Sequence, residues 1–128
     1  MRKTVEQRVA SLVGQVITTV YIDQWSVTLL TLESAVITEG HWTLFDSAGV
    51  AVDSDCEDIV RQDFKLWKAL GTTIVASNIS RDNHLKLVFD NGLQLEVRSD
   101  DDGYEDWHLN SEGGLMLIVN DKTITTFS

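Results

Sequence analysis

Acidic side chains are the residues of this sequence best suited to bind a ligand or to act as acids and bases. Twenty Asp and Glu stand against ten Lys and Arg, so the formal net charge is −10 and the isoelectric point is about 4.5. Asp53, Asp55 and Glu57 alternate along the chain, and a second cluster surrounds Gly103. A calcium-binding EF-hand loop needs Gly at its sixth position and Glu at its twelfth, and neither cluster meets both requirements. We therefore expect no metal site and no cofactor. The alternative is a loose calcium site on the surface. The second cluster consists of Asp100, Asp101, Asp102, Glu105 and Asp106.

Nucleophilic and metal-dependent catalysis have no support in the sequence. His41, His84 and His108 are too far apart to form a short metal-ligand motif, and His41 and His108 each adjoin a tryptophan and are expected to face solvent. Cys56 lies on the apolar side of a predicted helix, where cysteine is usually a small buried hydrophobe. Nucleophile-elbow, zinc-protease and phosphate-loop motifs are absent from the sequence. The sequence therefore predicts a protein that is not an enzyme.

The negative charge restricts the partners. A chain this acidic repels nucleic acid and anionic membranes and attracts cations and basic proteins. No apolar run approaches the ~20 residues that a membrane-spanning helix needs, and no apolar signal segment follows the basic residues at the N-terminus. The single cysteine excludes an internal disulfide, which is typical of a reducing compartment. We expect a cytoplasmic protein that binds neither nucleic acid nor membranes.

The four tryptophans have different expected roles. Trp42 and Trp107 are predicted to anchor the core, and Trp67 belongs to an apolar helical stripe. Trp25 follows Asp23 at a predicted turn. It is either an exposed anchor for a partner, since tryptophan is enriched at the centres of interfaces, or a residue buried under the edge of a sheet.

Two segments are predicted to be helical. Within the first eleven residues, Thr4 and Gln7 match a capping box, and apolar residues follow at helical spacing. Near residues 55–70, Ser54 and Glu57 match a second capping box. The apolar stripe of this second helix consists of Cys56, Val60, Phe64 and Trp67.

The remaining residues are predicted to form antiparallel strands, because short β-branched and apolar runs alternate with polar turns. Residues 85–89 and 93–97 alternate between apolar and polar side chains, which indicates one buried face and one solvated face. Asp90, Asn91 and Gly92 lie between them. This turn predicts a hairpin of type I′, which needs positive φ at both central residues.

The chain contains an internal similarity. A shift of 65 residues brings Trp42 onto Trp107, and a shift of 57 residues brings Gly14 onto Gly71. Internal repeats indicate that a structural unit occurs twice. We therefore predict one domain spanning residues 1–128, of the α+β class. It is expected to be mainly antiparallel sheet from two repeated halves, about 12–53 and 69–119, with an N-terminal helix and a central helix near 55–70.

The second half resembles a family of small, functionally uncharacterised bacterial α+β domains. The residues that carry the resemblance are Leu70 and Gly71 at a helix end, an alternating run over 85–97, and a Tyr-Glu-x-Trp unit that begins at Tyr104. The C-terminal sequence NDKTITTFS departs from the family, which usually ends in Pro-Gly-Gly and a tryptophan. Small acidic domains of this type look like bacterial immunity proteins, which neutralise toxins by binding them. This second likeness depends on size, charge and type and on no motif.

The resemblance and the charge together favour a non-enzymatic protein that binds and neutralises a basic toxin domain, such as a nuclease domain. An acidic inhibitor is steered electrostatically to a basic cleft. Two alternatives remain: a self-associating structural or regulatory module that forms a homodimer, and a small-ligand-binding protein. The expected partner-binding residues are Asp100, Asp101, Asp102, Glu105, Asp106 and Trp25.

Overall fold

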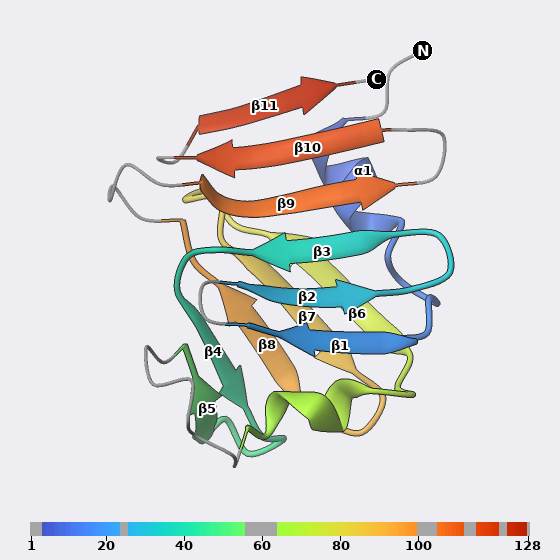
Figure 1. Cartoon of the computed structure of the whole chain (residues 1–128), viewed down its shortest axis with the longest axis vertical. Helices are drawn as coiled ribbons and strands as arrows, with labels where there is room; N and C mark the ends of the chain where they lie inside the picture. Colours follow the sequence, from blue (N-terminus) through green and yellow to red (C-terminus); the bar gives the residue numbers. More distant parts are fainter. Residues whose placement is uncertain are drawn as a thin grey trace.

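The computed structural model is built mainly of antiparallel β-sheet (Figure 1). It describes residues 4–23, 26–55, 64–99, 105–111, 115–120 and 123–127. In chain order the elements are α1 (Val5–Ala10), β1 (Thr19–Ile22), β2 (Val27–Leu30), β3 (Ala35–Thr38), β4 (Trp42–Phe45), β5 (Ala51–Ser54), the 3₁₀ helix η1 (Leu66–Ala69), β6 (Ile74–Ile79), β7 (Leu85–Phe89), β8 (Gln94–Val97), β9 (Glu105–Ser111), β10 (Leu115–Asn120) and β11 (Thr123–Phe127).

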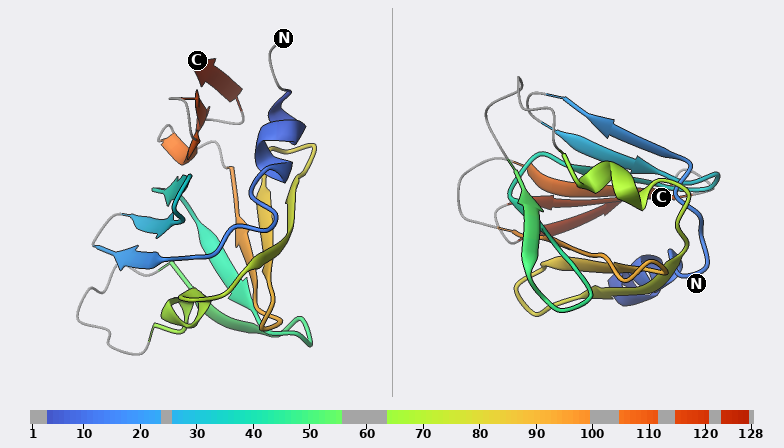
Figure 2. Two further views of the ribbon diagram at one scale, coloured as in Figure 1. Left: turned by 90° about the vertical axis from the view of Figure 1, so that its right-hand side faces the viewer. Right: turned by 90° about the horizontal axis from the view of Figure 1, so that it is seen from below.

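The described strands form two sheets that face each other. One has six strands in the order β1-β2-β3-β9-β10-β11, and the other has five in the order β5-β4-β8-β7-β6. Figure 2 shows them as two layers, with η1 near one end of the molecule and α1 near the other. Every strand pair is antiparallel, as the sequence predicts.

The chain changes sheet in each half. Strands β1 to β3 form a meander in the six-stranded sheet, and the chain then crosses to add β4 and β5 to the other sheet. Strands β6 to β8 form a meander in the five-stranded sheet, and the chain crosses back for β9 to β11. The strand pairs that link the two halves have the same register. Thr38 of β3 lies opposite Trp107 of β9, and Val97 of β8 lies opposite Trp42 of β4.

The two segments that lead from a helix into the first strand of each meander are hydrogen bonded to each other. The Gly14 amide donates to the Ile74 carbonyl at 2.8 Å, and the Gly71 amide donates to the Ile17 carbonyl, also at 2.8 Å. These reciprocal bonds join the two sheets at one side of the molecule.

Helix content is lower than the α+β prediction implies, so the chain is mainly β. The N-terminal helix forms with the predicted capping box, in which Thr4 Oγ1 accepts the Gln7 amide at 3.1 Å and Gln7 Oε1 accepts the Thr4 amide at 2.9 Å. The prediction of a central helix near 55–70 is wrong for those of its residues that the structure describes. Ser54 ends β5 instead of capping a helix, and only Leu66–Ala69 is helical, in the tighter 3₁₀ form. Residues 56–63 of that prediction lie outside the described residues.

The hairpin between β7 and β8 also differs from the prediction. A type I′ turn needs positive φ at Asn91 and at Gly92, but of these two residues only Gly92 has it, with φ +89°. The Phe89 amide bonds to the Leu93 carbonyl at 2.9 Å, and the Gly92 amide bonds to the Phe89 carbonyl at 3.0 Å. The connection is therefore a three-residue loop with glycine at its left-handed position.

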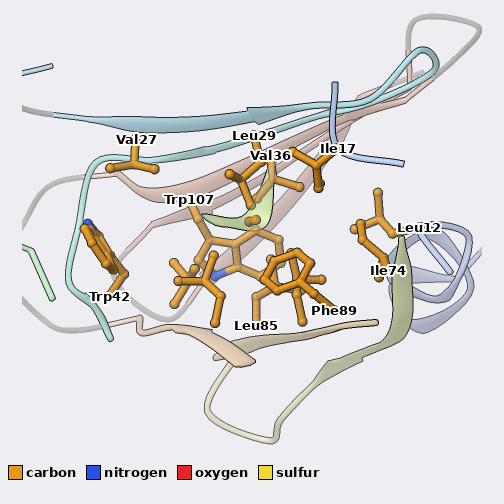
Figure 3. Packing of buried hydrophobic residues seen from close by; sticks show 14 of the residues in the cluster. Leu12, Ile17, Val27, Leu29, Val36, Trp42, Ile74, Leu85, Phe89 and Trp107 are labelled. Carbon is orange, nitrogen blue, oxygen red and sulfur yellow. The ribbon is translucent and has the colours of Figure 1, made fainter. Parts of the chain in front are cut away.

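The core fills the space between the sheets and is made of alternate strand residues. Trp107 has 0% exposure and lies near its centre, close to Leu85 and Phe89 (Figure 3). The Trp107 indole N–H donates to the Asn83 carbonyl at 2.9 Å, so its only polar atom is satisfied. Trp42 is also buried, and both tryptophans are therefore confirmed as core residues.

Candidate functional site

Most of the predicted partner-binding residues lie outside the part of the chain that the structure describes. Asp100, Asp101, Asp102 and Trp25 belong to undescribed positions. Glu105 and Asp106 open β9, and the structure describes only their backbone. The acidic cluster remains a prediction from the sequence.

The first acidic cluster divides into residues with different roles. Asp53 is buried, with only 7% of its surface exposed. One carboxylate oxygen accepts the Ser54 amide at 2.9 Å, and the other accepts the Lys65 and Leu66 amides at 2.6 and 3.0 Å. A carboxylate at the start of a helix satisfies amides that have no intrahelical partner. Asp53 is therefore the structural cap of η1, supplied by β5, the strand that precedes this helix in the chain.

Asp55 holds His41 at the end of the β4–β5 hairpin. Its Oδ2 lies 2.9 Å from His41 Nδ1, and its Oδ1 accepts the Trp42 amide at 3.2 Å. The exposed fractions of the His41 and Asp55 side chains are 47% and 35%, so water reaches this contact and weakens any attraction between charges there. Glu57, the third member of the cluster, lies outside the described residues. Within the described part of the chain, no three His, Cys, Asp or Glu residues converge on a metal site.

The 3₁₀ helix η1 and the residue that follows it present two large apolar side chains to solvent. Leu66 and Ala69 are fully buried, whereas Trp67 is 58% exposed and Leu70 is 51% exposed. The prediction that Trp67 joins a buried stripe is wrong, because the 3₁₀ repeat of three residues turns Leu66 and Ala69 inward together. Lys68 lies beside this exposed pair in the chain.

The outward face of the six-stranded sheet is a second candidate surface, and most of its described side chains are half-buried. Val36, Thr38, Trp107 and Leu109 point into the core, so the residues that alternate with them point away from it. Leu30, Ile37 and Ile118 do not belong to the core or to the residues packed against it. We define the β1–β10 outer face by those of its residues whose side chains the structure describes: Thr19, Tyr21, Thr28, Leu30, Ala35, Ile37, His108, Asn110 and Ile118.

The sequence prediction of a solvent-facing His108 is only partly correct. His108 lies on the β1–β10 outer face, directly between Ile37 of β3 and Ile118 of β10. It is half-buried among these neighbours. The sequence does not predict its position between two isoleucines, because β3, which supplies Ile37, comes from a distant part of the chain.

The outward face of the five-stranded sheet has a different composition. Its central row places Lys86 opposite Glu96, and Glu96 opposite Thr43 on the next strand. Oppositely charged cross-strand neighbours are typical of a solvated sheet face. The described residues of the three central strands on this β4–β8–β7 outer face are Thr43, Phe45, Lys86, Val88, Gln94 and Glu96.

No helix in the described residues is long and apolar enough to cross a membrane. The sequence profile of the Family of unknown function (DUF6188) matches residues 8–122. Because this match covers most of the sequence, the chain belongs to that family. No curated protein and no solved structure matches the sequence.

Proposed function

We propose that this member of a family of unknown function is a non-enzymatic protein-binding domain that neutralises a basic partner, such as a bacterial toxin nuclease domain, in the cytoplasm. The observation that carries the proposal is the net charge of −10 on a chain of 128 residues. A field of this sign speeds the approach of a basic protein and repels nucleic acid.

The chain offers both kinds of residue that such an interface needs. Asp100, Asp101, Asp102, Glu105 and Asp106 provide the charge in the sequence. Trp67 provides an exposed aromatic side chain of the type that carries much of the binding energy in protein interfaces. Trp25 remains a further anchor proposed from the sequence.

The test compares two triple variants with the same change in net charge. In the first, Asp100, Asp101 and Asp102 become Asn; in the second, Glu33 and Glu39 become Gln and Asp82 becomes Asn at exposed sites elsewhere. A partner is captured from the source cells, and its association rate is measured across a range of salt concentrations. We expect the first variant to lower the association rate and its salt dependence more than the second does. Equal effects of the two variants would reject the acidic cluster as the site, and binding insensitive to salt would reject the electrostatic proposal.

We also propose that the domain is an internal repeat, with halves at about 12–53 and 69–119. The like pairing of Thr38 with Trp107 and of Val97 with Trp42 supports this proposal. The bridge between Val16 and Thr73 gives further support, because it lies between the reciprocal bonds of the two helix-to-strand segments. On this interpretation, each half completes the sheet that the other half begins.

A further inference from the structure

We propose that Asn91 is a site of spontaneous deamidation and that opening of the β7–β8 turn controls the rate of this reaction. Among the asparagines of the sequence, Asn91 alone is followed by glycine. In the reaction, the backbone nitrogen of Gly92 attacks Cγ of Asn91 and forms a C–N bond, while the side-chain NH₂ group and the proton of the Gly92 amide leave together as ammonia. Water then opens the resulting cyclic imide at either carbonyl, which gives aspartate or isoaspartate. Glycine has no Cβ, so another atom can approach its backbone closely.

The fold itself requires the glycine that makes Asn91 reactive. Gly92 has φ +89°, a conformation that glycine adopts without strain. A Cβ at this position would lie 2.9 Å from the Cβ of Ser47, in the turn between β4 and β5. Asn91 is exposed, so water and hydroxide reach its side chain. The turn therefore keeps a reactive Asn-Gly pair at a position that is open to solvent.

Three hydrogen bonds hold the reacting groups in the closed turn. The Gly92 amide, which must lose its proton to attack, donates to the Phe89 carbonyl at 3.0 Å. Asn91 Nδ2 donates to the Lys68 carbonyl at 3.1 Å, and Asn91 Oδ1 accepts the Leu93 amide at 3.1 Å. The first bond withholds the nucleophile, and the other two restrain the side-chain amide at both of its polar atoms. The reaction therefore needs a local opening of the turn, and its rate follows the population of the open state.

The product breaks the link between this turn and η1. Lys68 belongs to η1, and the bond from Asn91 Nδ2 joins that helix to the β7–β8 turn. A carboxylate has no proton to donate, so in the aspartate form two acceptors face each other. The isoaspartate form also adds one carbon to the main chain of a three-residue loop whose ends, Phe89 and Leu93, are hydrogen bonded at 2.9 Å. Deamidation should therefore loosen η1, the helix that presents Trp67 to solvent.

The first experiment locates the reaction. The full chain is incubated in mildly alkaline buffer, with and without enough urea to unfold it, and modified peptides are mapped by mass spectrometry. Asn91 is expected to react first among the asparagines and to yield both aspartate and isoaspartate. Asn91→Gln is the matched control, because glutamine keeps the amide but would have to close a six-membered ring, which forms more slowly. A different asparagine reacting first in the unfolded chain, or an equal reaction at position 91 in Asn91→Gln, would overturn the site.

The second experiment tests the control by the turn. We expect the folded protein to react at least about 10-fold more slowly than the unfolded protein, because the turn is open for only a small fraction of the time. Hydrogen exchange of the Gly92 amide requires the same bond to Phe89 to break. Its rate and the rate of deamidation should therefore rise together as urea is added below the unfolding transition. Equal rates in the folded and unfolded chains, or deamidation that does not follow the exchange of Gly92, would overturn the control by the turn.

The third experiment measures the effect on η1 with Asn91→Asp, which reproduces the aspartate product. The Leu70 amide bonds to the Trp67 carbonyl at the end of η1, and loss of the bond to the turn should make its hydrogen exchange about 5- to 10-fold faster. Asn78→Asp, at an exposed position on β6, makes the same change of charge and is the matched control. Its Leu70 amide should exchange as in the wild type. Equal exchange of Leu70 in the two variants would show that the bond between Asn91 and Lys68 does not hold η1, and would overturn the proposed effect.

Discussion

The buried carboxylate of Asp53 provides a sharp test of how the chain holds η1 in place. Both of its oxygens accept backbone amides: one accepts Ser54, and the other accepts Lys65 and Leu66. In Asp53→Asn, one oxygen is replaced by an NH₂ group, which cannot accept a hydrogen bond. At least one amide then faces a donor, and a buried donor without a partner costs about 1–3 kcal/mol. Adding the loss of a charge-assisted helix cap, we expect the free energy of unfolding to fall by about 2–4 kcal/mol.

Asp46 provides the matched control for this substitution. A single oxygen of its carboxylate accepts the Ala48 and Val50 amides, at 2.9 and 3.0 Å. The amide oxygen of Asn can take the same position, so Asp46→Asn should change stability by less than about 0.5 kcal/mol.

The assay is urea unfolding followed by tryptophan fluorescence and by circular dichroism, with coincident transitions as the check on two-state behaviour. The slope of the transition should remain that of the wild type, because the extent of surface exposed on unfolding is unchanged. A loss below about 0.5 kcal/mol in Asp53→Asn, or an equal loss in Asp46→Asn, would refute the assigned role of Asp53.

Two further substitutions test the core and a turn. Trp107→Phe removes the indole N–H that bonds to the Asn83 carbonyl and leaves a cavity beside Phe89. We expect the free energy of unfolding in urea to fall by about 2–4 kcal/mol. A fall of less than about 1 kcal/mol would contradict this packing. Gly92→Ala adds a Cβ that would lie 2.9 Å from the Ser47 Cβ at a positive φ, whereas Gly49→Ala adds one with no atom within 4 Å at a similar φ. We expect the free energy of unfolding, measured by thermal denaturation, to fall by about 1 kcal/mol in Gly49→Ala and by about 1 kcal/mol more in Gly92→Ala. Equal decreases in the two variants would reject the contact with Ser47.

The local features of the fold are readable in the sequence because short-range physics determines them. The capping box of Thr4 and Gln7 forms as predicted, since its two hydrogen bonds join residues three positions apart. The alternation of Leu85, Leu87 and Phe89 predicts a strand with one buried face, and all three are buried. Such patterns depend only on the geometry of a single element.

The candidate sites also combine features that are visible in the sequence with features that only the fold decides. The acidic clusters and the tryptophans are visible in the sequence, but the sequence alone does not tell a solvated carboxylate from a buried one. Asp53 becomes a helix cap only because β5 brings it to Lys65 and Leu66, which follow 12 and 13 positions later in the chain. Trp67 becomes an exposed residue only because Leu66 and Ala69 take the inward positions of η1.

The sequence by itself determined the charge, the antiparallel β character and the positions of most strands, because these follow from composition and from the two-residue period of a strand. The tertiary structure alone decided which sheet each strand joins. Strand β3 pairs with β9 and β8 pairs with β4, and these pairings join backbone groups that no local pattern relates. The β9–β10 hairpin sets His108 beside Ile118, and the β3–β9 pairing adds Ile37 to the same row on the outside of the six-stranded sheet. Ile37 joins this row only because hydrogen bonding between distant segments of the chain sets β3 beside β9.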